Sequence, residues 1–181
     1  MNSCSKSTNL FSPNSQLPTP HSLGFRMPAE WEPHRSTWLS WPKNITTWPG
    51  KLLKEVEFIY LEMISALLPH EKINLLVKDK DTAGAVLRTL AIRKTNTSNL
   101  VFHKVNTVDV WIRDYGPIFV VPRHSERAKR VKNLMMRSFA DAQDDISATA
   151  VTKWIFNAWG GKYSNLKKDN RVVEQLHSLA K

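Results

Sequence analysis

Strand-like and helix-like segments alternate in the first half of the sequence, and this order constrains the fold more than any other feature. The strand-like segments are short runs rich in β-branched and aromatic residues. In the helix-like segments, apolar residues recur every three or four positions, and Pro69 ends the first of them. The predicted strands are 36–41, 73–77 and 100–105. The predicted helices, 51–68 and 82–92, lie between them. Strands that alternate with helices predict an α/β fold.

The composition excludes several classes of protein. The chain has 181 residues, of which 41% are hydrophobic and 23% charged, as in ordinary globular domains. No apolar run approaches the roughly 20 residues of a membrane span. The net charge of +10 is spread along the chain instead of forming a basic stripe, which argues against a nucleic-acid binder. The single cysteine, Cys4, excludes a disulfide framework or a Cys-rich metal site, so we expect a cytoplasmic protein without a membrane partner.

Two segments do not fit the pattern of a compact domain. Residues 1–24 are rich in Ser, Pro, Asn and Thr without hydrophobic periodicity, and we expect a disordered leader there. Residues 122–149 show neither a strand nor a helix pattern, which indicates an insertion. The rest of 25–181 is predicted to form one domain. Its remaining expected elements are strands at 108–112, 118–121 and 151–156 and a helix at 170–179 with Asp169 as its N-cap.

The most informative motif is DVWIRDYGP, which begins at Asp109. If its first residues are extended, Asp109, Trp111 and Arg113 share one face, and Asp114 lies at the strand end. A carboxylate beside an indole suits a guanidinium, which donates two parallel hydrogen bonds and is attracted to the ring face. Alternatively, Arg113 pairs with Asp109 or Asp114 to neutralise buried charge, and Trp111 is ordinary core. The spacing leaves both interpretations open.

Four blocks of the sequence together resemble the Porphyromonas-type peptidyl-arginine deiminase family, which includes the agmatine deiminases. These blocks are GFRMPAEWEPHRSTWLSWP (24–42), TWPG (47–50), DVWIRDYGPIFVV (109–121) and WIFNAWGGKY (154–163). The resemblance implies roughly the N-terminal half of a pentein, a five-bladed α/β propeller with a central active site. It implies hydrolysis of the guanidine of agmatine to N-carbamoylputrescine and ammonia, towards putrescine, without metal or organic cofactor.

The resemblance also implies roles for particular residues. Asp114 matches the aspartate that holds the substrate guanidinium, and Trp111 matches a tryptophan that lines the same pocket. Asp109 and Arg113 match positions expected to brace the turn beside the substrate. Two further tryptophans belong to a family loop near the pocket mouth, where plain loop packing is an equal alternative. These two are Trp41 and Trp48.

The sequence departs from the family in its catalytic groups. Family members use a nucleophilic cysteine and a histidine with a neighbouring aspartate, all in a second half that has no counterpart here. Cys4 lies in the leader and His34 has no matching context, so we expect the chain alone to be inactive. A non-catalytic guanidine- or arginine-binding module is the alternative, and peptidyl arginine cannot be separated from agmatine as the substrate. The family resemblance is compatible with a homo-oligomer.

Overall fold

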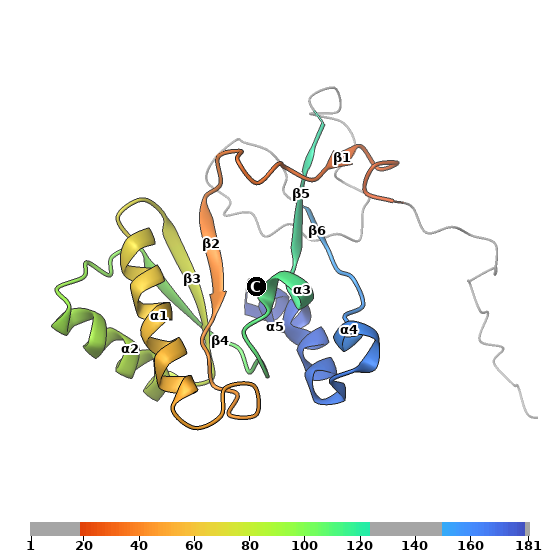
Figure 1. The fold of residues 1–181 in the computed structure, drawn as a ribbon. Helices are drawn as coiled ribbons and strands as arrows, with labels where there is room; N and C mark the ends of the chain where they lie inside the picture. Colours follow the sequence, from red (N-terminus) through yellow and green to blue (C-terminus); the bar gives the residue numbers. More distant parts are fainter. Residues whose placement is uncertain (1–18, 124–149, 180–181) are drawn as a thin grey trace, which may run out of the picture.

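The computed structural model describes residues 19–123 and 150–179. Its first sheet is parallel and consists of β2 (Ser36–Ser40), β3 (Lys72–Val77) and β4 (Leu100–Lys104), in that spatial order. Thr37 pairs with Ile73, and Ile73 pairs in turn with Leu100. Helices α1 (Leu52–Leu67) and α2 (Lys80–Ile92) connect these strands and lie on one side of the sheet (Figure 1). The predicted α/β alternation is confirmed in this half.

The apolar stripes of the two helices explain their packing. Leu61 and Ile64 of α1 and Val86 and Leu90 of α2 are buried, as the three- and four-residue spacing requires. The Asp79 carboxylate caps α2 by accepting a hydrogen bond from the Thr82 amide at 2.8 Å. The first core cluster of buried residues is Trp41, Leu61, Ile64, Leu68, Ile73, Leu75, Val77, Val86 and Leu90.

A second core lies on the opposite face of the same sheet. Strand side chains alternate between faces, so Leu76 leaves the first cluster and packs with the C-terminal segment. Short helices build this side (Figure 1): α3 (Ile112–Tyr115), α4 (Ala158–Gly161), the 3₁₀ helix η3 (Ser164–Arg171) and α5 (Val172–Leu179). The buried residues of this cluster are Leu76, Val105, Tyr115, Phe156, Ala158, Leu166, Val172 and Leu176.

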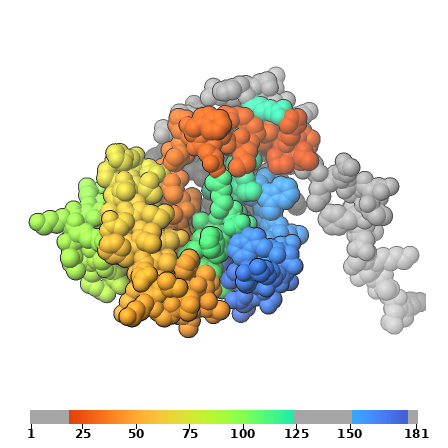
Figure 2. Space-filling view, viewed as in Figure 1, coloured from red at the N-terminus to blue at the C-terminus, as the bar shows by residue number. Residues whose placement is uncertain are grey.

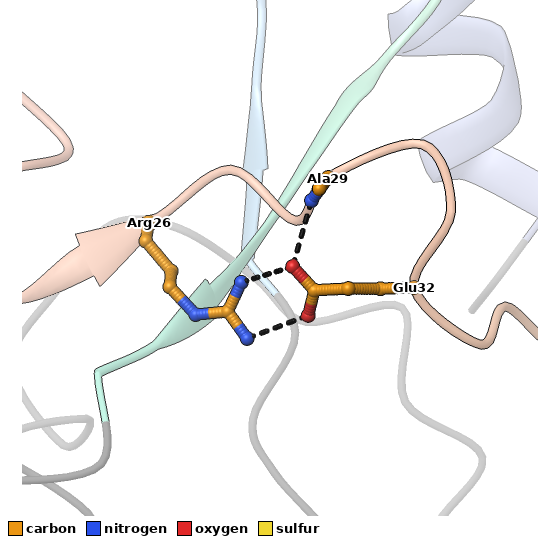
Figure 3. A network of polar contacts seen from close by, with 3 residues as sticks. All are labelled: Arg26, Ala29 and Glu32. Atoms are coloured by element: carbon orange, nitrogen blue, oxygen red, sulfur yellow. Dashed lines mark hydrogen bonds and ion pairs between the residues drawn. The ribbon is translucent and has the colours of Figure 1, made fainter.

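The second sheet is small and antiparallel. It consists of β1 (Phe25–Arg26), β5 (Ile118–Pro122) and β6 (Ala150–Thr152), with β5 in the middle. The loop from β1 to β2 is fastened by a bidentate pair between Arg26 and Glu32, both of whose hydrogen bonds are 2.7 Å long (Figure 3). The Ala29 amide donates to the same carboxylate at 2.8 Å. This loop is therefore held in one conformation by its own side chains.

The predicted strand at 108–112 is wrong. Residues 108–110 bend and Ile112 begins α3, because the amides of Val108 and Asp109 donate to the Asp169 carboxylate instead of to a neighbouring strand. The prediction that Asp169 is the N-cap of the last helix is wrong as well. Asp169 lies inside η3, and its carboxylate binds a chain segment about sixty residues away.

The predicted strand at 151–156 is only partly correct, because β6 ends at Thr152 and the Phe156 amide donates to Asn170 Oδ1 at 3.0 Å. Pro122, the first residue of the predicted insertion, is the last residue of β5. The rest of the predicted insertion, from 124 to 149, and residues 1–18 of the predicted leader lie outside the described residues. Within residues 19–123 and 150–179, the two sheets form no closed propeller, and no helix is long and apolar enough to cross a membrane.

Candidate functional site

A pocket of about 510 Å³ lies between the loop after β2 and the C-terminal segment. Figure 2 shows this loop, in orange, beside the blue C-terminal segment at the lower edge of the molecule. The residues that line the pocket are Thr46, Thr47, Asp109, Trp111, Trp159, Tyr163, Asn165 and Leu166. The pocket therefore joins three segments that are far apart in the sequence.

Asp109 supplies the acidic group of the pocket. Only 1% of this residue is exposed. Its Oδ2 accepts hydrogen bonds from the Thr47 hydroxyl and, at 3.3 Å, from Asn44 Nδ2, and its Oδ1 accepts one from the Val110 amide at 2.8 Å. All these donors are neutral, and within the described part of the chain no Lys or Arg forms an ion pair with Asp109. The negative charge is therefore held in place without being neutralised.

Three aromatic rings form the wall next to this carboxylate. Trp159 packs edge-on against Trp111, with ring centroids 6.1 Å apart, and against Tyr163, at 5.9 Å. Between 41% and 45% of each of these three residues is exposed, so ring surface remains open. Ring faces attract organic cations, and the attraction strengthens when water is excluded.

The AWGG segment of α4 presents Trp159 through an unusual backbone. Trp159 has a φ of 53° and Gly160 a φ of 75°, both in the left-handed region that glycine tolerates and tryptophan rarely adopts. The Asn157 side chain stabilises this turn by accepting a hydrogen bond from the Gly160 amide at 2.9 Å. Strain of this kind at a pocket wall is typical of functional sites.

Buried polar groups behind the pocket fix the backbone of Asp109. The Tyr115 hydroxyl donates to the Asp109 carbonyl at 2.7 Å, and Ser40 Oγ donates to the same oxygen at 3.2 Å. Burial raises the pKa of the Tyr115 phenol far above its ordinary value, so this donor keeps its proton. Burial also raises the pKa of Asp169, although hydrogen bonds from the Val108 and Asp109 amides oppose that shift.

The structure places the motif residues differently from the extended arrangement. Trp111 and Asp109 reach the pocket, whereas Asp114 and Arg113 lie exposed in α3 and do not line it. Arg113 pairs with Glu30 and not with Asp109 or Asp114, so the charge-neutralising alternative is wrong. Within the described residues, the Asp114 carboxylate has no hydrogen-bonding or ion-pairing partner.

The two loop tryptophans also lie away from the pocket lining. Trp41 is buried in the first core, where it packs edge-on against Tyr60 with centroids 6.1 Å apart. Trp48 is half-buried, and its Nε1 has no hydrogen-bonding partner among the residues that the structure describes. Their contact with substrate stays a prediction. His34, whose sequence context does not match the family's catalytic histidine, pairs with Glu71 at 2.8 Å.

Sequence reasoning missed several pocket residues. Trp159 and Tyr163 lie in the quoted WIFNAWGGKY block, so the block itself was the available signal. Thr47 lies in the TWPG block, and only its hydroxyl type hinted at a hydrogen-bonding role. Asn165 and Leu166 carried no signal. In the described ranges, no three His, Cys, Asp or Glu side chains gather where they could hold a metal ion.

Comparison with known proteins shows which family this chain is similar to. The model of the Porphyromonas-type peptidyl-arginine deiminase family matches residues 26–181. The agmatine deiminase of Pseudomonas aeruginosa is 28% identical over 162 residues, which cover 87% of this chain and 36% of that enzyme. The agmatine deiminase of Medicago truncatula is 28% identical over 143 residues, covering 79% of this chain and 32% of that protein.

Solved structures give the same picture. The agmatine deiminase of Enterococcus faecalis superposes with a TM-score of 0.62 at 25% identity, covering 89% of this chain and 37% of that one. The chain thus spans about a third of the length of the curated relatives that it matches. The described α/β fold is that of the corresponding part of these enzymes.

Proposed function

Because the chain belongs to the Porphyromonas-type peptidyl-arginine deiminase family, we propose that it supplies the guanidinium-binding part of an agmatine deiminase-like hydrolase. The reaction is the hydrolysis of agmatine to N-carbamoylputrescine and ammonia, on a route to putrescine. The observation that carries this proposal is a buried, unneutralised carboxylate, Asp109, next to the three open rings of the pocket wall. An acidic pocket with aromatic walls favours a planar organic cation over an anion or a neutral ligand.

We propose a different role for each of three residues around the guanidinium. Trp111 offers a ring face, and Asp109 provides the negative field of the pocket. Asp114 is the residue that the family resemblance assigns to the bidentate hydrogen bonds. Its exposed carboxylate, without a partner in the described residues, is free to accept them. Asp114 stands one helical turn after Trp111, whose carbonyl accepts its amide at 2.9 Å.

The proposal includes inactivity of the chain by itself. Hydrolysis of this type needs a thiolate that attacks the guanidinium carbon, a proton donor that releases ammonia, and water that cleaves the covalent amidino intermediate. Cys4 is the single cysteine of the sequence. We therefore expect binding of agmatine without turnover. We further propose that the two sheets are parts of a five-bladed propeller, that the protein acts in the cytoplasm, and that the family's assembly is a homo-oligomer.

Titration calorimetry with the purified full chain tests the proposal. Agmatine should bind, and putrescine, which keeps the amine but lacks the guanidine, should bind at least about tenfold more weakly. Asp109→Asn and Asp114→Ala should each weaken agmatine binding about tenfold or more. The first variant removes the negative charge of the pocket, and the second removes the carboxylate that accepts the bidentate hydrogen bonds of the guanidinium. Asp81→Asn, an exposed position on α2, is the matched control and should bind like the wild type.

The outcomes separate the alternatives. Agmatine binding without ammonia release supports the proposal, and robust release of ammonia by the chain alone contradicts the expected inactivity. Equal binding of agmatine and putrescine contradicts a guanidinium site. Titration with an N- and C-terminally blocked arginine peptide addresses the peptidyl substrate, because tighter binding of that peptide than of agmatine would favour protein arginine.

A further inference from the structure

Asp169 is a buried acid for which the proposed function gives no role. It is 1% exposed and lies in η3, between the core residues Leu166 and Val172. Its carboxylate accepts hydrogen bonds from two consecutive backbone amides, those of Val108 and Asp109, the second at 3.0 Å. Among the described residues no Lys or Arg forms an ion pair with it. Burial of an unpaired carboxylate is costly, and the two backbone hydrogen bonds are what offsets that cost here.

The two amides belong to the segment that carries the acidic group of the pocket. The Asp109 amide is held by Asp169, and the Asp109 carbonyl is held by Tyr115 and Ser40. With both backbone groups fixed, the Cα–Cβ bond of Asp109 has a fixed direction, and its carboxylate accepts the Thr47 hydrogen bond at the pocket. Asp169 is the group that reaches this segment from η3, the element that also supplies Leu166 to the pocket.

We propose that Asp169 is a positioning residue for the pocket: its carboxylate holds the Val108–Asp109 backbone and thereby aims the Asp109 carboxylate at the bound cation. The inference rests on the proposed function, because it assumes that the pocket takes a guanidinium. It goes further by assigning the preference for a cation to a residue that does not line the pocket.

The electrostatics of the pair fit this role. Burial and the neighbouring charge of Asp109 both raise the pKa of Asp169, with burial the larger cause. The charge of Lys43 lowers the pKa of Asp169, but the Lys43 ammonium donates its hydrogen bond to Asn106 Oδ1, 2.9 Å away. Two buried carboxylates are thus held close together at a cost, and a cation in the pocket relieves part of their repulsion.

The test compares Asp169→Asn with the wild type and with Asp81→Asn, the same chemical change at an exposed position. One measurement is the ratio of the Kd of N-carbamoylputrescine to that of agmatine. The two ligands share the amine tail but differ in having a neutral or a charged head, so a general loss of folded protein does not change the ratio. In Asp169→Asn this ratio should fall about tenfold. The amides of Val108 and Asp109 donate to different oxygens of Asp169, and in Asn an NH2 group, which cannot accept, replaces one of them, so the Asp109 carboxylate is no longer held in position. In Asp81→Asn the ratio should stay at the wild-type value.

The second measurement needs no ligand. Amide hydrogen exchange of Val108 and Asp109 should be slow in the wild type and at least about tenfold faster in Asp169→Asn. If the exchange rates of the two amides in Asp169→Asn equal those of the wild type, the role of Asp169 is overturned. The role is also overturned if the wild type binds agmatine and Asp169→Asn has the same Kd ratio. Absence of agmatine binding by the wild type overturns the proposed function instead, whatever the exchange shows. If Asp169→Asn does not fold, Asp169→Glu replaces it, since the longer side chain displaces the same two bonds, and the expected and contradicting results are the same.

Discussion

Replacing Tyr115 with Phe isolates one hydrogen bond behind the pocket. The ring is buried and packs against Phe156 with centroids 6.0 Å apart, and Phe keeps that packing. The hydroxyl is lost, and with it the 2.7 Å bond to the Asp109 carbonyl. That carbonyl still accepts from Ser40 at 3.2 Å, so no buried acceptor is left unsatisfied. The expected loss in the free energy of unfolding is therefore that of one neutral hydrogen bond, about 1 kcal/mol, instead of the roughly 1–3 kcal/mol of an orphaned group.

Urea unfolding followed by tryptophan fluorescence measures this loss. Tyr163→Phe makes the same chemical change where the residue is 45% exposed, and it should stay within about 0.5 kcal/mol of the wild type. In a chain of this size, 1 kcal/mol also lowers Tm by about 2–4 °C. If Tyr115→Phe were no less stable than Tyr163→Phe, the hydroxyl would not hold Asp109. A loss above about 3 kcal/mol would mean that Ser40 does not share the carbonyl.

Two further results are expected. Leu90→Ala should lower the free energy of unfolding by about 2–5 kcal/mol, because Leu90 is fully buried in the first core. Leu87→Ala, at a 39% exposed position of the same helix, should lower it clearly less. Equal losses in urea unfolding would contradict the assigned buried face of α2. The Tyr60 phenol should titrate with a pKa of about 12, raised from 10.0 by burial and by the charge of Asp109. Because the folded state holds this phenol in its protonated form, Tyr60 stabilises the fold below pH 10.0, and the stabilisation is lost as the pH rises through 12. Alkaline unfolding should therefore begin between pH 10.0 and 12. An ultraviolet titration in which every tyrosine ionises near pH 10.0 would contradict the raised pKa of Tyr60.

The β2–β4 half of the fold was predictable because its signals are local. The spacing of Leu61 and Ile64, or of Val86 and Leu90, is fixed by helix geometry alone. The segment at 108–112 has an equally strand-like sequence, yet it bends, because its amide partners come from Asp169. A residue about sixty positions further along the chain leaves no trace in local periodicity. The conformation of residues 108–112 is therefore set by tertiary hydrogen bonds and not by local propensity.

The pocket was predictable only in its residue types. The predicted cation site paired the acid Asp114 with the indole of Trp111. Of these two residues only Trp111 lines the pocket, and the acid that lines it is Asp109, which was expected only to brace the turn. The extended backbone that was assumed put Asp114 at a strand end, whereas the turn of α3 sends it to the exposed surface. Trp159 was invisible as a partner of Trp111, since their contact depends on a left-handed backbone that tryptophan rarely adopts.

Strand β3 contributes to both cores, and this has a consequence for how the molecule unfolds. Leu75 points into one core and Leu76 into the other. A slip of β3 by one residue against its neighbours would exchange the two faces and empty both interiors at once. Neither side can lose its packing without loosening the strand that the other side needs. We therefore expect the helices α1 and α2 and the pocket wall to melt together, in one cooperative transition.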